Sequence, residues 1–355
     1  MSGTAINQAQ FEQLQGKVMG DVGGAMGMLM AYIGDQTGVY RALEAHGPCS
    51  HATLAEQAGV DPRYLREWLS ANAVFGYVSY DAEADEFSLS PEQAALFAHE
   101  GEPTCMQGFF QAVIGQMTTH DLAVDVFRTG RGRPWGEHHS CCFCGTDRFF
   151  RPGYVANLVD HWIPALDGVQ AKLEAGARVA DVGCGRGSSS LLMAKHFPNS
   201  IIHGFDFHQP SIQAATDEAA EEQLGNVEFR VSTAKDFPGA EYDLVCIFDA
   251  LHDMGDPVGA ARHIRDALRP GGTFMLVEPM AGDSLEQNLP NLLSGIFYSF
   301  STTVCVPTSK AQEVGLGLGA QAGEARLREI LQEAGFGSIR RATETPSNMV
   351  LEATA

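Results

Sequence analysis

The sequence predicts an α/β protein with a doubly wound parallel sheet in its C-terminal half and an α-rich module at its N-terminus. From residue 178 onward, short apolar runs alternate with helical stretches, a pattern that requires parallel strands joined by crossover helices. The first hundred residues have helical patterns and no apolar strand pattern before residues 77–80. The length of 355 residues also exceeds the size at which a single core usually divides.

The N-terminal module, residues 1–103, is expected to hold three short helices and a hairpin. A serine begins the second helix and a glycine ends it, while Asp61 caps the third helix and Pro62 occupies its first turn. Three helices followed by a hairpin are the order of a winged helix-turn-helix. The expected helices cover residues 38–43, 50–59 and 61–69, and the expected strands cover residues 76–80 and 86–89.

The expected recognition helix of this module, residues 61–73, carries no net charge, because Asp61 and Glu67 balance Arg63 and Arg66. The whole chain has 23 basic and 44 acidic residues and a net charge of −21. Because a nucleic-acid reader needs a basic face, the pattern favours a dimerisation and substrate-covering module over a DNA-binding one. A cofactor-sensing winged-helix transcription regulator stays as an alternative.

The composition predicts a cytoplasmic protein with no membrane partner. No apolar run reaches the roughly 20 residues that span a bilayer, and no charged-then-apolar leader opens the chain. Eight scattered cysteines without a secretory context favour reduced thiols over a disulfide framework. We also expect a homodimer, with the first 35 residues between subunits, because methionines such as those in residues 20–30 suit irregular apolar contacts.

A connecting region over residues 104–167 is rich in aromatic residues and is expected to pack between domains and to cover a substrate pocket. It contains the sequence HHSCCFC, with Cys141, Cys142 and Cys144 in one cluster. Thiolates and imidazoles this close are typical of soft metal or metalloid sites, although structural zinc sites use paired C-x-x-C spacing. Metal binding and a role as reactive lid residues both stay open.

The C-terminal domain, residues 168–355, is expected to contain five parallel strands with intervening helices and two closing strands. The expected strands cover residues 179–182, 201–205, 227–231, 242–248, 273–277, 339–342 and 348–353. The expected helices cover residues 188–196, 211–224, 257–268 and 324–334.

The loop after the first of these strands, residues 181–187 (DVGCGRG), is the strongest functional signal. Alternate glycines let a backbone lie against a ligand, but a dinucleotide site needs G-x-G-x-x-G to seat a pyrophosphate. An acidic residue before the glycines repels phosphate and attracts an ammonium group. The second strand ends at Asp206, 25 residues after Asp181, where a carboxylate can accept both ribose hydroxyls of an adenosine. S-adenosylmethionine combines an adenosine with an ammonium group and has no phosphate.

With these motifs, residues 179–278 resemble the class I S-adenosylmethionine-dependent methyltransferases. The signatures occur in the family's order, including YDLV at residues 242–245 and LRPGG at residues 268–272. The resemblance extends over nearly the whole chain to a bacterial group with a winged-helix module, through residues 251–257 and 319–324. That group is related to small-molecule O-methyltransferases. The resemblance implies a Rossmann-like methyltransferase domain that uses S-adenosylmethionine on a small-molecule methyl acceptor.

The resemblance also implies roles for individual residues. Asp181 would meet the cofactor's ammonium group, Asp206 would hold the ribose and Phe207 would cover the adenine. The family often has an Asp where Thr233 stands, so contact with the exocyclic amine could fall to Asp236 or to a backbone carbonyl. The implied cofactor-binding residues are Asp181, Gly183, Cys184, Gly185, Gly187, Asp206, Phe207, Thr233, Ala234 and Asp249.

Methyl transfer to a hydroxyl requires alignment, exclusion of water and removal of a proton. His252 follows the fourth strand, where ligands bind in parallel sheets, and matches the catalytic histidine of the related L-H-D motif. It is the expected general base, oriented by Asp253 or Asp249. Residues 291–305 are expected to close the acceptor pocket, with Tyr298 as a candidate substrate contact.

The sequence therefore predicts a small-molecule O-methyltransferase. A second hypothesis is an S- or metalloid methyltransferase that uses the cysteines at positions 141, 142 and 144. The winged-helix regulator is the third.

Overall fold

The computed structural model describes residues 6–355 and divides the chain into two compact units. The first unit contains the chain up to Ile114 together with Cys144–Pro152. The second contains Gly115–Phe143 and Gly153–Ala355. The connecting region is thus shared between the two units.

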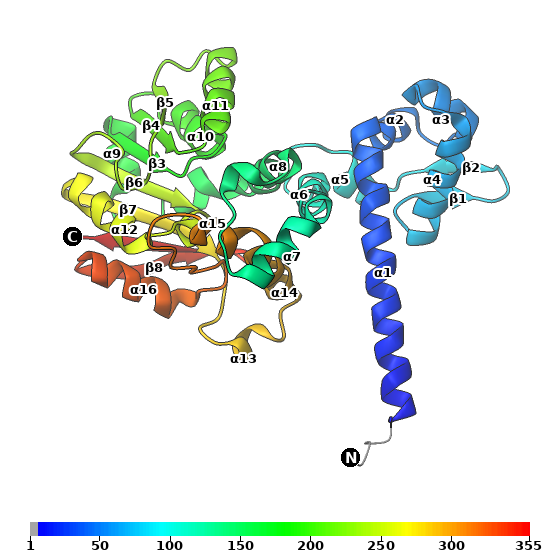
Figure 1. Cartoon of the computed structure of the whole chain (residues 1–355). Coiled ribbons are helices and arrows are strands. Elements are labelled where there is room, and N and C mark those ends of the chain that lie inside the picture. The colour runs from blue at the N-terminus through cyan, green and yellow to red at the C-terminus, as the bar shows by residue number, and fades with distance from the viewer. Residues whose placement is uncertain (1–5) are drawn as a thin grey trace. The chain divides into compact units, whose positions relative to one another are not determined.

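The first unit has the expected order of three helices and a hairpin, preceded by a long helix and followed by a short one (Figure 1). The side chain of Ser50 accepts a hydrogen bond at the start of α3, and that of Asp61 accepts two at the start of α4. Buried aromatic and aliphatic residues, including Tyr40 and Trp68, form its core. The elements are α1 (Gln8–Thr37), α2 (Val39–His46), α3 (His51–Ala58), α4 (Pro62–Phe75), β1 (Ser79–Asp81), β2 (Glu86–Ser88) and α5 (Pro91–Phe97).

The second unit is built on a seven-stranded sheet in the order β5-β4-β3-β6-β7-β9-β8. The five strands from β5 to β7 are parallel, whereas β9 runs antiparallel to both β7 and β8. The strand expected over residues 273–277 is longer, because β7 includes the preceding LRPGG motif. The strands are β3 (Arg178–Val182), β4 (Ile201–Asp206), β5 (Val227–Val231), β6 (Tyr242–Phe248), β7 (Leu268–Pro279), β8 (Ser338–Glu344) and β9 (Asn348–Thr354).

Helices cover both faces of this sheet, with α10 and α11 on one side and α12 and α16 on the other (Figure 1). All seven residues of β6 are buried, which explains its continuous apolar sequence. The doubly wound prediction is therefore confirmed. The helices are α9 (Val169–Ala175), α10 (Ser188–His196), α11 (Gln209–Glu221), α12 (Pro257–Ala267) and α16 (Gly323–Ala334).

Two further segments, the connector and the chain after β7, are mostly helical, and neither was predicted element by element. No helix among residues 6–355 is long and apolar enough to cross a membrane. The connector forms α6 (Gln107–Thr118), α7 (His120–Thr129), η1 (Trp135–Glu137), α8 (Ser140–Asn157) and the π-helical turn η2 (Leu158–Trp162). The chain after β7 forms α13 (Leu285–Asn288), α14 (Leu292–Phe300), the π-helical turn η4 (Ser301–Cys305) and α15 (Val306–Lys310).

Two glycines of α1 provide a matched test of packing in the first unit. A Cβ atom at buried Gly34 would lie 2.5 Å from Cε2 of Tyr40 and would also collide with the ring of Trp68, whereas exposed Gly24 has nothing within 4 Å of that position. We expect Gly34→Ala to lower the unfolding free energy by about 1–3 kcal/mol through overpacking. Gly24→Ala should raise it by up to about 1 kcal/mol, because alanine favours helix. Thermal unfolding followed by circular dichroism would compare them, and equal shifts would contradict the packing account.

Candidate functional site

The glycine loop between β3 and α10 is held against β4 by its own backbone. The N–H groups of Gly183 and Cys184 donate to the carbonyl oxygen of Phe205 at 2.7 and 3.1 Å. The φ angles at Gly183, Gly185 and Gly187 are 77°, 53° and 83°, in the region that favours glycine. A Cβ at Gly185 would meet nothing within 4 Å. The loop thus leaves one stretch of backbone uncovered, where a ligand can approach.

Asp181, near the end of β3, is a fully buried carboxylate with one oxygen unpaired. Its Oδ2 accepts hydrogen bonds from the hydroxyls of Ser189 and Ser190, both at 2.6 Å. Its Oδ1 is buried and has no hydrogen-bond partner among the described residues. Burial raises the pKa of Asp181 to about 6, against the lowering effect of the two serines. The side chain therefore lacks one donor, which a bound cation or water would supply.

Asp206, the last residue of β4, is oriented by two backbone hydrogen bonds. Its Oδ2 accepts from Gly185 N–H at 2.9 Å and its Oδ1 from His208 N–H at 2.8 Å. Burial raises its pKa. Each carboxylate oxygen has two lone pairs, so Asp206 can still accept two hydroxyl donors. Phe207 follows it with 49 % of its surface exposed.

Two of the implied cofactor residues, Thr233 and Ala234, lie in the segment after β5. The hydroxyl of Thr233 donates to Oδ2 of Asp236 at 2.7 Å, so the residue at the family's Asp position is tied to the next carboxylate along the chain. Ala234 packs against the core of the sheet.

The thiol of Cys184, on the glycine loop, stays protonated. Burial and the charges of Asp181 and Asp206 raise its pKa well above its usual value.

His252 lies in a 3-10 turn, η3 (Leu251–Asp253), directly after β6 and is 4 % exposed. Its Nδ1 lies 2.5 Å from Oε2 of Glu278, whose Oε1 accepts from Leu251 N–H at 2.9 Å. Its Nε2 lies 3.4 Å from Oδ1 of Asp253. Burial lowers the pKa of His252, but the carboxylates of Glu278 and Asp253 outweigh burial and hold it above the ordinary value.

Glu278 was not predicted, and it takes the orienting position that the sequence assigned to Asp253 or Asp249. Instead, Oδ1 of Asp249 accepts from Nδ2 of Asn348 at 2.7 Å. Burial and the nearby charge of Glu278 raise the pKa of Asp249 well above its usual value. The sequence signal that could have identified Glu278 was an acidic residue at the carboxyl end of the apolar strand β7, which pairs with β6.

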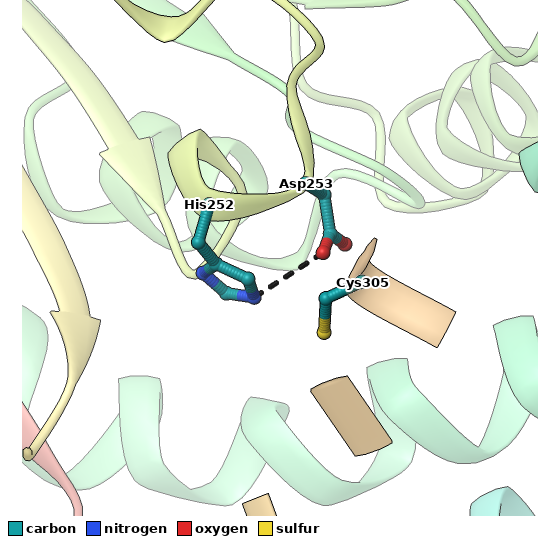
Figure 2. A group of neighbouring side chains, drawn as sticks. All are labelled: His252, Asp253 and Cys305. Atoms are coloured by element: carbon teal, nitrogen blue, oxygen red, sulfur yellow. Dashed lines mark ion pairs between the residues drawn. The ribbon is translucent and has the colours of Figure 1, made fainter. Parts of the chain in front are cut away.

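Cys305, on the turn η4, is the second site residue that the sequence reasoning missed. Figure 2 shows its thiol beside the side chains of His252 and Asp253. The three potential ligand atoms all lie within 4.8 Å of one another. Burial and the charge of Asp253 raise the pKa of the Cys305 thiol to about 12. The candidate acceptor contact Tyr298 lies one helix earlier, where its phenol oxygen accepts from Nδ2 of Asn288 at 3.2 Å.

The cysteines singled out in the sequence lie at the start of α8. Cys141 and Cys142 are buried and Cys144 is partly exposed. Cys142 belongs to a small apolar cluster that also includes Cys305. Among residues 6–355, the group of three metal-ligating side chains is that of His252, Asp253 and Cys305, and it includes none of the three cysteines of α8.

Comparison with known proteins places family models on both halves of the chain. Residues 173–335 match the model of a methyltransferase domain. Residues 24–99 match the model of an Rv2258c-like winged HTH domain. The predicted winged helix is thereby confirmed.

Curated relatives align with about half of the chain. A demethylmenaquinone methyltransferase of Listeria monocytogenes is 28 % identical over 182 residues, which cover 48 % of this chain and 73 % of the relative. The nocamycin O-methyltransferase of Saccharothrix syringae is 29 % identical over 175 residues, 48 % of this chain and 62 % of the relative.

Solved structures share the fold over almost the whole chain. The mitomycin 7-O-methyltransferase has a TM-score of 0.71 at 18 % identity and covers 98 % of this chain and 100 % of its own. Human N-acetylserotonin methyltransferase, solved in complex with S-adenosylmethionine, has a TM-score of 0.72 at 16 % identity, with 99 % of each chain covered.

The doubly wound sheet, the glycine loop and the two matching domain models agree with one another. The chain joins a winged helix-turn-helix domain to a methyltransferase domain.

Proposed function

We propose that this enzyme methylates a hydroxyl group of a small, partly apolar acceptor, with His252 as the general base. The observation that carries the proposal is the pairing of His252 with Glu278 directly after β6. The relatives named for O-methylation of nocamycin and mitomycin support oxygen as the methylated atom.

The His252–Glu278 pair suits removal of a proton from the acceptor. Glu278 accepts the proton on Nδ1, so once the ring is neutral the lone pair of Nε2 points away from Glu278, on the side of the ring where Asp253 lies 3.4 Å away. When Nε2 takes the hydroxyl proton, the carboxylate on the opposite side of the ring stabilises the resulting imidazolium. Nε2 of His252 is therefore a stronger base, which assists transfer of the hydroxyl proton in the transition state.

The residues around the glycine loop suit S-adenosylmethionine. Bound there, it supplies an electrophilic methyl group whose bond to sulfur breaks with the electron pair left on sulfur. The unpaired Oδ1 of Asp181 would receive the ammonium group directly or through water. Asp206 would accept the ribose hydroxyls, and exposed Phe207 would cover the adenine, whose edge would meet Thr233 and Ala234.

Methylation of a thiol or a metalloid is the second candidate. It is supported by the position of Cys305 beside His252 and by the packing of Cys142 in the same cluster as Cys305. A direct comparison of phenol acceptors with their thiophenol counterparts, measured by release of S-adenosylhomocysteine, separates the two. Faster turnover of the thiophenols would favour the second candidate.

We also propose a homodimer in which a second copy covers an exposed stripe of α1. Large apolar side chains repeat every three or four residues along one side of this helix and are 47–60 % exposed. Its later part packs within its own unit, since Gly27, Ala31 and Gly34 are buried. The stripe consists of Phe11, Leu14, Val18, Val22 and Met26.

The winged-helix domain has no basic face on α4 that would support the regulator hypothesis. Arg63 is paired with Glu67 at 2.6 Å on the exposed side of the helix, and Asp61 caps its start. Because both residues of the pair are well exposed, the pairing leaves a neutral surface rather than a phosphate-binding one. A role in dimerisation fits this surface better.

Removal of the base should slow the chemical step without affecting cofactor binding. We expect His252→Ala to lower kcat by about 10²- to 10⁴-fold, the usual contribution of a general base. The Kd for S-adenosylmethionine, measured by calorimetry, should change by less than about threefold. His196→Ala, an exposed histidine on α10, serves as the control and should keep normal turnover. Undiminished turnover in His252→Ala would contradict the assignment.

Replacement of Asp181 should stabilise the empty enzyme and weaken cofactor binding. A pKa displaced from 3.8 to about 6 corresponds to roughly 3 kcal/mol at neutral pH. That cost is absent below pH 4, grows as pH rises to about 6 and is constant above, so Asp181→Asn should have the higher Tm at pH 7.5 and lose this advantage near pH 4. Its affinity for S-adenosylmethionine should fall at least about tenfold at pH 7.5. A lower Tm at pH 7.5 with unchanged affinity would contradict the proposed role.

Charges on the stripe of α1 should separate the subunits. We expect the double variant Val18→Asp/Val22→Asp to be monomeric in size-exclusion chromatography with light scattering, because two carboxylates would be buried at the interface. The matched control Ala9→Asp/Gln13→Asp adds the same charges, at the same spacing, to exposed positions on the opposite side of the helix and should stay dimeric. A monomeric unmodified protein, or equal dissociation of both variants, would refute the proposed interface.

A further inference from the structure

The cluster of His252, Asp253 and Cys305 has the composition of a transition-metal site, although the methyl-transfer mechanism requires only its histidine. Nitrogen, oxygen and sulfur donors come from two segments, the turn after β6 and the π-helical turn before α15. His252 and Cys305 are 4 % and 5 % exposed, and Oδ1 of Asp253 is buried. The three side chains lie side by side (Figure 2), and the burial of these atoms shields them from water.

The spacing of the donors fits a shared ion. Ligands at the 2.0–2.3 Å distances of zinc lie about 3.3–3.8 Å apart in a tetrahedral site. The 3.4 Å between Nε2 of His252 and Oδ1 of Asp253 already has this value. Since no pair among the three atoms exceeds 4.8 Å, the thiol of Cys305 needs to move by about 1–1.5 Å at most.

A further carboxylate, that of Glu278, binds His252 at Nδ1, the ring nitrogen that does not face Asp253. Glu278 accepts from Nδ1 at 2.5 Å and is itself anchored by Leu251 N–H at 2.9 Å. Metal-binding histidines usually donate their second ring N–H to a carboxylate or carbonyl, which fixes the tautomer and makes the ligating nitrogen more basic. Glu278 gives His252 this arrangement, with Nε2 as the ligand atom.

We propose that His252, Asp253 and Cys305 form a three-ligand site for Zn²⁺ or a similar borderline-soft divalent cation. One imidazole, one carboxylate and one thiolate suit zinc better than magnesium or calcium, which prefer oxygen ligands alone. The carboxylate and thiolate together carry two negative charges, which balance the ion. Binding releases the thiol proton of Cys305 to solvent. With three protein ligands, a fourth tetrahedral position is left for water or another small ligand.

Occupation of this site has a consequence that rests on the proposed function. The lone pair of Nε2 cannot both bind the ion and remove a proton from the acceptor. Zinc is therefore expected to inhibit methyl transfer by withdrawing the general base, while leaving the cofactor loop of residues 181–187 unaffected.

Metal binding can be tested without any acceptor. The full-length protein, treated with a chelator, would be titrated with Co²⁺ and then with Zn²⁺. We expect one ion per chain, with a cobalt–thiolate charge-transfer band that zinc abolishes. Cys305→Ser should lose the band and bind at least about tenfold more weakly, and Asp253→Asn should bind about as weakly while keeping the band. Cys49→Ser, another buried cysteine, should behave as the unmodified protein.

Binding of S-adenosylmethionine to each variant verifies that it is folded. A folded protein that binds no ion stoichiometrically, or a Cys305→Ser variant with the normal band and affinity, would overturn the metal site whatever the activity.

The rate of S-adenosylhomocysteine release with and without zinc then distinguishes the metal site from the proposed base. Inhibition that follows occupancy, and that Cys305→Ser relieves relative to its own zinc-free rate, supports both. Stoichiometric binding without inhibition would confirm the site and contradict the role of His252 as base.

Discussion

The site depends on four buried or half-buried carboxylates that lie together at one edge of the parallel sheet. Asp181, Asp206, Asp249 and Glu278 stand at or beside the carboxyl ends of β3, β4, β6 and β7. Burial raises the pKa of Asp181, Asp206 and Asp249, and neighbouring acids raise those of Asp181 and Asp249 further. Desolvated carboxylates at these strand ends lower the stability of the folded protein when no ligand is bound, and their charge is complementary to that of a cation. S-adenosylmethionine carries positive charge on both its ammonium and its sulfonium groups, so its binding would offset the cost.

The proposed cofactor site and the proposed general base lie at different positions along this edge. Asp181 and Asp206 lie around the glycine loop, where the backbone near Gly185 is open to a ligand. Glu278 lies on the other side of β6 in the sheet order and binds His252. In the proposed mechanism, the cofactor side would rely on carboxylates that accept hydrogen bonds from the ligand, whereas the acceptor side would use a carboxylate to make a histidine more basic. The zinc proposal follows from this second arrangement, since a basic and oriented imidazole is also a good ligand.

The sequence predicted the parts of the fold and site that depend on local patterns. Apolar runs predicted the inner strands of the large sheet, the more polar strand β8 was placed by its position before the last strand, and the alternate glycines with Asp181 and Asp206 predicted the loop. Glu278 and Cys305 were missed because each reaches His252 across a long stretch of sequence. The pairing of β6 with β7 brings Glu278 there, and the course of the chain from α14 to α15 brings Cys305. The HHSCCFC segment contributes no side chain to the group of three metal-ligating residues found among residues 6–355, and adjacent helix positions such as Cys141 and Cys142 point their side chains in different directions.

The most direct test of the account is the proton balance of cofactor binding. S-adenosylmethionine would be titrated calorimetrically at pH 6 in buffers of different ionisation enthalpy. Because the pKa of Asp181 is about 6 in the empty protein and an ammonium partner lowers it, binding should release up to about half a proton. The release should vanish at pH 8 and in Asp181→Asn. Proton uptake at pH 6, or the same release from Asp181→Asn, would contradict the claim that the buried carboxylate edge is the receptor for the cofactor's charge.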